Sequence, residues 1–294
     1  MSHTSSLAAE PVLQARARLG ECPVWDSEQQ RLYWVDVYNH RVHEFNPETH
    51  ADRCIETGDV VPALAIARGH RLLLALRDRL AFLHLDSGEI QTLRQLEFSL
   101  PDTRFNDGKC DPQGRFWVGT VSQEAGQAAL YRYDPDGSLH VMETGLTISN
   151  GMGWSPDGAT FYLTDSHVRT IYAYRFDGGS GTISDRRVLI NLSGSAPEPD
   201  GLTIDGRGHL WIALWNGWCI AHFDANGREV ERIDLPVQRP TSVTFGGPRL
   251  ADLYVTSASV ALSQAEIQRG FQAGDLFRIP AAAVGTPARP YAAP

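Results

Sequence analysis

Short apolar segments alternate with turns rich in Pro, Asp, Asn and Gly along the whole chain. The clearest example is Ser149 to Gly158, a short predicted strand with a Pro-Asp-Gly turn, which the apolar run Phe161 to Asp165 follows at once. Equivalent apolar runs begin at residues 32, 72, 116, 161, 210 and 253, so the spacing is 40 to 49 residues. A repeat of this length that contains several strands predicts a β-propeller.

Two further strands are predicted in each repeat. The third alternates apolar and polar residues, as in Ile171 to Tyr174, which is the pattern of a half-buried strand. A turn and a fourth strand follow, as in Leu139 to Glu143. A short capped helix is predicted at Ser263 to Gly270, inside the last repeat. Six repeats of four strands predict an all-β fold, a six-bladed β-propeller with four-stranded antiparallel blades.

The two ends of the repeat array predict how the ring closes. The last repeat ends near Ile279 without a fourth strand, and residues 12–18 precede the first repeat and belong to none. Pairing of this N-terminal strand with blade six would close the ring and remove an open sheet edge. We therefore predict a flexible N-terminus over residues 1–10, one propeller domain over residues 11–280 and a frayed Ala/Pro-rich tail over residues 281–294.

Composition and charge narrow the class of partner. The chain has 294 residues, of which 42% are hydrophobic, and 35 acidic side chains against 26 basic ones give a formal charge of −9. This balance argues against nucleic acid or an anionic membrane as the main partner. No apolar run approaches the roughly 20 residues of a membrane helix, and the first residues lack the features of a signal peptide. We predict a cytoplasmic monomer or weak homo-oligomer that binds a small polar molecule.

The cysteines do not suggest a metal knuckle or a disulfide framework, because they are far apart and no pair has CxxC spacing. We expect buried free thiols. The four residues are Cys22, Cys54, Cys110 and Cys219.

One position in each repeat differs in a way that predicts a site. In a propeller the first strand of each blade lines the central channel, so the residues that open these strands form a ring at one mouth. Four of the six are acids or amides. The ring consists of Glu21, Pro62, Asn106, Asn150, Asp200 and Thr241.

Two readings of this ring stay open from the spacing alone. Converging carboxylates are unfavourable unless a cation lies between them, and an all-oxygen shell suits Ca²⁺, Mg²⁺ or Mn²⁺ better than a metal that prefers thiolate. In the alternative reading, the Asn-Gly and Asp-Gly pairs only form turns.

The loops between the second and third strands open at the same mouth and could provide the walls of a site for a polar, sugar-sized ligand. His167 could act as a general base there, although an exposed loop histidine is the more ordinary interpretation. The loops contain Asp36 to Tyr38, Thr120 to Glu124, Asp165 to His167 and Trp215 to Trp218.

The chain resembles the senescence marker protein 30/gluconolactonase family of six-bladed propeller lactonases. The resemblance extends from Leu19 to Phe277, and its most specific parts are Arg104 to Pro112, Ser149 to Gly151 and Pro199 to Gly201. It implies a metal held by Glu21, Asn150 and Asp200, which favours the metal reading of the ring. It also implies that Arg104, Asn106 and Glu124 contact the substrate.

We therefore predict the divalent-metal-dependent hydrolysis of a sugar-acid lactone, such as glucono-, xylono- or arabinonolactone, to the open-chain aldonic acid. Asp200 is the predicted general base, and Arg104 and Asn106 would orient the ring hydroxyls. One divalent ion is expected, which could be Ca²⁺, Zn²⁺, Mn²⁺, Mg²⁺ or Fe²⁺. The alternatives are a phosphotriesterase or other esterase on the same propeller, and a non-catalytic metal-binding interaction propeller.

Overall fold

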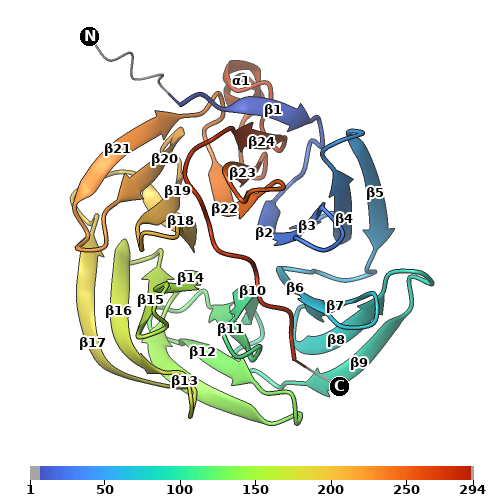
Figure 1. Cartoon of the computed structure of the whole chain (residues 1–294), viewed down its shortest axis with the longest axis vertical. Coiled ribbons are helices and arrows are strands. Elements are labelled where there is room, and N and C mark those ends of the chain that lie inside the picture. Colours follow the sequence, from blue (N-terminus) through green and yellow to red (C-terminus); the bar gives the residue numbers. More distant parts are fainter. Residues whose placement is uncertain (1–6, 293–294) are drawn as a thin grey trace.

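The chain folds into six four-stranded antiparallel sheets arranged in a ring (Figure 1). The computed structural model describes residues 7–292. Blades one to three consist, from inner to outer strand, of β2 (Gly20–Asp26), β3 (Arg31–Asp36), β4 (Arg41–Asn46) and β5 (Ala51–Glu56); β6 (Ala63–Ala67), β7 (Arg71–Ala75), β8 (Arg79–His84) and β9 (Ile90–Gln95); and β10 (Arg104–Cys110), β11 (Phe116–Val121), β12 (Ala128–Tyr133) and β13 (Leu139–Leu146).

The second half of the ring repeats this arrangement, which confirms the predicted six-bladed propeller. Blades four to six consist of β14 (Ser149–Trp154), β15 (Thr160–Asp165), β16 (Thr170–Asp177) and β17 (Thr182–Asn191); β18 (Glu198–Ile204), β19 (Leu210–Trp215), β20 (Cys219–Phe223) and β21 (Glu229–Asp234); and β22 (Pro240–Gly246), β23 (Asp252–Ser257), β24 (Leu276–Ile279) and β1 (Glu10–Leu13).

Blade six contains strands from both ends of the chain. β1 pairs with β24 as the outer strand, with Glu10 opposite Arg278, and the two side chains form an ion pair. The strand is shorter than the predicted segment 12–18, because Arg16 adopts a left-handed conformation (φ 52°) that turns the chain away from the sheet.

The predicted flexible N-terminus is only partly covered by the structure. Residues 1–6 lie outside the described range. Leu7 and Ala9 pack against the apolar cluster between blades five and six, so this part of the segment is held against the ring.

The C-terminal segment crosses the ring (red in Figure 1), so the expectation of a frayed tail is wrong for residues 284–292. Its backbone bonds to blade five, where Gly206 N donates to Val284 O at 2.7 Å, and to blade two, where Tyr291 N donates to Ile66 O at 2.7 Å. Tyr291 is fully buried and stacks on Tyr133. Together with residues of the inner strands, the segment lines a cavity of about 260 Å³.

Large aromatic side chains join neighbouring blades. Trp25 of blade one stacks on Tyr254 of blade six with ring centroids 5.7 Å apart, and Trp117 of blade three packs on Phe161 of blade four at 5.0 Å. Each such ring buries about 150 to 250 Å² and contributes a large share of the core. The blades are therefore fixed relative to one another, which positions the residues that line the channel.

The predicted helix is present as α1 (Gln264–Arg269), with Ser263 and Glu266 forming the capping box. It has six residues. Between residues 7 and 292, no helix is long and apolar enough to cross a membrane.

Candidate active site at the polar mouth of the channel

The polar ring predicted from the repeat is found on the inner strands of the blades. These strands contact one another in the order β2, β6, β10, β14, β18 and β22, and β22 returns to β2. The ring residues are Glu21 on β2, Asn106 on β10, Asn150 on β14, Asp200 on β18 and Thr241 on β22, with Pro62 directly before β6.

Strand register shifts wherever the ring residue is polar. Pairing of the first two strands of a blade is interrupted after Glu21, after Ser149 and after Pro199. Blades three and six have the same irregularity. Blade two, whose ring position is Pro62, pairs without interruption. Bulges of this kind redirect side chains and are common beside functional sites.

Two ring residues are followed by glycine because neighbouring inner strands approach closely. A Cβ on Gly151 would lie 2.5 Å from the carbonyl oxygen of Asp200, and one on Gly201 would lie 2.1 Å from Ser242 Oγ. Both glycines lie inside strands and neither has a positive φ. The Asn-Gly and Asp-Gly pairs are therefore not turns. They allow the close packing that brings Asn150 and Asp200 together.

Asn150 presents a buried oxygen with no partner. Its Nδ2 donates to Ser166 Oγ at 3.0 Å and to a carboxylate oxygen of Asp200. Ser166 Oγ donates in turn to the carbonyl of Pro199 at 2.7 Å. No hydrogen-bond partner for Asn150 Oδ1 is found in the described part of the chain. A buried polar atom left unpaired costs about 1 to 3 kcal/mol, so this oxygen is a natural ligand for a cation.

Buried negative charge accumulates around Asn150. Burial raises the pKa of Glu21 well above its usual range, and the charges of Asp200 and Asp107 raise it further. Burial, then Asp107, raises the pKa of Asp200 in the same direction. These shifts share one physical cause, which is that carboxylates removed from water lie close to one another. A divalent cation would relieve both the desolvation and the repulsion.

Asp107 is a member of this cluster that the sequence analysis did not identify. It follows Asn106 in the bulge of β10, is 7% exposed, and accepts the N–H of Gly108 at 2.7 Å. Burial raises its pKa, which the charge of Lys109 opposes. The motif Arg104 to Pro112 contains Asp107, but the repeat comparison considered one ring position in each blade, and Asn106 occupies that position in blade three.

Arg104 and Asn106 form one connected group at the rim. Arg104 Nη1 donates to Asn106 Oδ1 at 3.0 Å, and Nη2 donates to the Tyr38 hydroxyl at 3.4 Å. Asn106 Nδ2 donates to the carbonyl of Ser149, next to Asn150, at 3.1 Å. Two of the predicted substrate contacts are thus connected to the metal-ligand candidates through the backbone.

Glu124 and His167 are less integrated. Both are exposed loop residues. Within residues 7–292, no hydrogen bond or ion pair joins the side chain of Glu124 to Arg104 or Asn106, and Glu124 forms its hydrogen bonds, to Ser122 and Gln127, through its backbone. The structure therefore brings together five of the predicted side chains, whereas the side chain of Glu124 makes no hydrogen bond or ion pair with them among the described residues.

Two acids beside these loops, Asp36 and Asp165, are structural. Asp36 accepts the N–H groups of Arg18 and Leu19 at 3.1 and 3.2 Å, and Asp165 accepts those of Thr147 and Ile148, both at 3.1 Å. Each carboxylate thereby fixes the chain that leads into an inner strand. At this mouth of the channel, Glu21, Asn150 and Asp200 fit a divalent cation, because they combine two carboxylates with an amide oxygen that has no hydrogen-bond partner among the described residues.

Comparison with known proteins identifies the family of the chain. The family described as SMP-30/Gluconolactonase/LRE-like region matches residues 19–259. The chain belongs to this family. The resemblance that the motifs indicated is thereby confirmed, and the match spans the ring from before Glu21 to the end of β23.

Relatives within the family match almost end to end. Pentonolactonase XacC of Haloferax volcanii is 39% identical over 280 residues, which cover 94% of this chain and 95% of the relative. Regucalcin of Homo sapiens is 31% identical over 283 residues, which cover 94% of this chain and 95% of that relative. The crystal structure of the calcium-binding protein regucalcin from Agrobacterium tumefaciens has a TM-score of 0.93 at 27% identity, covering 97% of this chain and 98% of that one.

Proposed function

We propose that this protein hydrolyses a sugar-acid lactone with the help of one divalent cation held by Glu21, Asn150 and Asp200. The observation that carries the proposal is the buried, unpaired Asn150 Oδ1 beside two carboxylates of raised pKa. The family relatives named pentonolactonase and regucalcin support the reaction class and the use of a metal.

The cation, when bound, would supply Lewis acidity toward the lactone carbonyl and lower the pKa of a water molecule. The remaining chemistry belongs to the chain. Asp200 accepts a proton from the attacking water, whose oxygen forms the new bond to the carbonyl carbon. The ring C–O bond breaks, and its oxygen takes the proton that Asp200 holds and becomes a hydroxyl of the open-chain aldonic acid, so Asp200 returns to its starting form. The reaction needs only lactone and water.

Arg104 and Asn106 bind and orient the sugar hydroxyls in this proposal. Arg104 already donates hydrogen bonds to Asn106 and Tyr38, so its guanidinium is held at the mouth of the channel before substrate arrives. Glu124 is proposed as a third contact, and its exposed loop position predicts that Glu124→Gln raises KM and leaves kcat unchanged.

The ligand set favours a hard cation. Glu21, Asn150 and Asp200 offer only oxygen, which suits Ca²⁺, Mg²⁺ or Mn²⁺. Calcium binding by the regucalcin of Agrobacterium tumefaciens supports Ca²⁺ as one occupant. For the substrate, the pentonolactonase relative supports five-carbon lactones such as xylono- and arabinonolactone, alongside gluconolactone.

A panel of substrates tests the reaction class. The protein, loaded with one divalent ion, is assayed on 1,4- and 1,5-aldonolactones, a phosphotriester and a simple aryl ester under matched conditions. We expect the highest kcat/KM on an aldonolactone. A clear preference for the phosphotriester would overturn the proposal and favour a phosphotriesterase.

A further inference from the structure

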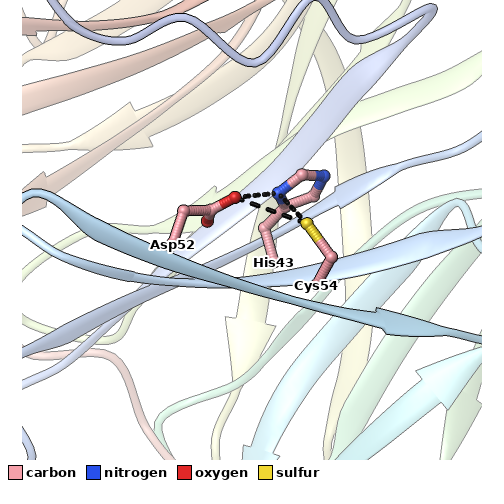
Figure 2. Close-up of side chains that lie close together, drawn as sticks. All are labelled: His43, Asp52 and Cys54. Carbon is pink, nitrogen blue, oxygen red and sulfur yellow. Dashed lines mark hydrogen bonds and ion pairs between the residues drawn. The ribbon is translucent and has the colours of Figure 1, made fainter.

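A second group of metal-ligating side chains lies outside the channel, on the outer hairpin of blade one. His43 lies on β4, and Asp52 and Cys54 lie on β5. His43 is directly opposite Cys54 in the strand pairing, and Asp52 precedes Cys54 by two residues. Because side chains two apart on a strand share a face, the hairpin places all three together (Figure 2).

The three potential ligand atoms form a small triangle. His43 Nδ1 lies 2.8 Å from Asp52 Oδ2, and Cys54 Sγ lies 3.4 Å from each of these atoms. A tetrahedral Zn²⁺ with bonds of about 2.0 to 2.3 Å separates its ligands by roughly 3.3 to 3.6 Å. The separation of His43 Nδ1 and Asp52 Oδ2 therefore needs to widen by roughly half an ångström to accept the ion, whereas the distances to Cys54 Sγ already lie in this range.

The cluster is rigid on one side and open on the other. The His43 ring stacks on Trp34 with centroids 3.8 Å apart, and its side chain is 6% exposed. Asp52 Oδ1 is buried and makes no hydrogen bond to any described residue. Cys54 is exposed, which contradicts the expectation that all four cysteines are buried and leaves a route for an ion and a water ligand.

The arrangement does not suit a nucleophilic thiol. In a Cys-His-Asp relay the acid and the thiol contact different nitrogens of the imidazole, whereas here Asp52 and Cys54 both approach Nδ1. Convergence of N, O and S on one point is the geometry of a metal site.

A related cluster in blade five has the same stacked histidine as blade one but no cysteine opposite it. His222 stacks on Trp211 at 4.0 Å and contacts Glu231 at 3.1 Å, as His43 does with Trp34 and Asp52. Blade five has Glu231 opposite the histidine, where blade one has Cys54. The nearby Asp205 already accepts two backbone N–H groups and the Trp211 indole. The stacked histidine is thus a shared structural element, and the thiol is particular to blade one.

We propose that His43, Asp52 and Cys54 form a binding site for Zn²⁺ or a cation of similar softness, with a fourth position open to water. A thiolate, an imidazole and a carboxylate match the preferences of Zn²⁺. The ring in the channel differs from this site because its proposed ligands are all oxygen atoms. The proposal concerns a separate site and does not depend on the reaction proposed above.

Cobalt spectroscopy on the purified full chain tests the site directly. Co²⁺ replaces Zn²⁺ in tetrahedral sites, and thiolate ligation gives a charge-transfer absorption that the oxygen ligands of the channel do not produce. We expect this absorption in the metal-stripped protein on addition of Co²⁺, its loss when Zn²⁺ is added, and its absence in Cys54→Ser and His43→Gln. His222→Gln, the matched histidine of blade five, should retain it. Absence of the absorption in the wild type, or its persistence in Cys54→Ser, would overturn the proposal.

A second measurement needs no variant. The wild-type protein is alkylated with iodoacetamide in the presence and absence of Zn²⁺, and modification of each cysteine is read by mass spectrometry. We expect Zn²⁺ to slow labelling of Cys54 at least about tenfold, while the buried Cys22, Cys110 and Cys219 stay unmodified in both conditions. Equal labelling of Cys54 with and without Zn²⁺ contradicts the site.

Discussion

The channel ring and the blade-one cluster are assembled in different ways. Glu21, Asn150 and Asp200 come from three blades and meet only when the propeller is complete. His43 and Cys54 face each other across a single hairpin and meet through local strand pairing. The first set offers oxygen alone and the second offers nitrogen, oxygen and sulfur. Catalysis is therefore expected to depend on the closed ring, whereas the outer site depends on one hairpin.

The largest expected difference concerns Asp200. Asp200→Asn removes one of two anionic ligands and the proposed base, so kcat/KM for an aldonolactone should fall at least about a hundredfold. Asp224→Asn is the matched control, since Asp224 lies in an exposed turn of the same blade and caps N–H groups there. Steady-state assays compare the two. Near wild-type activity in Asp200→Asn would remove the base from the mechanism.

The free energy of unfolding, measured with and without the cation, tests whether Asp200 is a ligand independently of its role in hydrolysis. A cation at about 100 times its Kd should stabilise the wild type by about 2.7 kcal/mol against unfolding, and Asp200→Asn much less. Without metal, Asp200→Asn should be at least as stable as the wild type, because Glu21 and Asp107 lose a negative neighbour. Denaturant unfolding with and without the ion gives both numbers. An equal metal effect in the two proteins would contradict ligation by Asp200.

Arg104 is expected to have an intermediate effect. Arg104→Lys keeps the charge but loses the planar set of donors that reaches both Asn106 and Tyr38. We expect kcat/KM to fall about tenfold, which is about 1.4 kcal/mol, mostly through KM. Kinetics on the preferred lactone measure this change, with Arg175→Lys, an exposed residue of β16 in blade four, as the surface control. An unchanged KM would contradict the proposed contact between Arg104 and the sugar.

The smallest effect is predicted for the blade-one cluster. Cys54→Ser should leave lactone hydrolysis within about twofold of the wild type, since Cys54 belongs to an outer strand and not to the channel. The assay is run in the same ion as the wild type. A loss of activity comparable to that of Asp200→Asn would show that the two sites are coupled.

The features predicted well from sequence are those that repeat. Six similar strand patterns revealed the propeller, and the comparison of repeats singled out four polar ring positions. The set Glu21, Asn150 and Asp200 came from the family resemblance. The bulges at these residues were not predicted, because register depends on pairing between strands. Features that occur once were missed. Tyr291 anchors a tail whose Ala and Pro content suggested disorder, and Asp107 is a buried acid in a blade where only the amide Asn106 was singled out.

The cysteine prediction was wrong at Cys54 for a similar reason. A thiol is usually buried, but β5 is the outer strand of its blade and most of its residues are exposed. Composition gave no information on which strand would be outermost. The contact with His43 depends on cross-strand register, which neither spacing nor residue type specified.

The central claim is that sugar-lactone hydrolysis depends on a cation held by the channel ring. The most direct test is the initial rate of aldonolactone hydrolysis by metal-stripped protein as Ca²⁺, Mg²⁺, Mn²⁺, Zn²⁺ and Fe²⁺ are restored one at a time, in the wild type and in Asp200→Asn. We expect the stripped wild type to be inactive, at least one ion to restore hydrolysis by about a hundredfold or more, and Asp200→Asn to stay inactive with every ion. Full hydrolysis by the stripped protein, or no hydrolysis with any ion, would contradict the account.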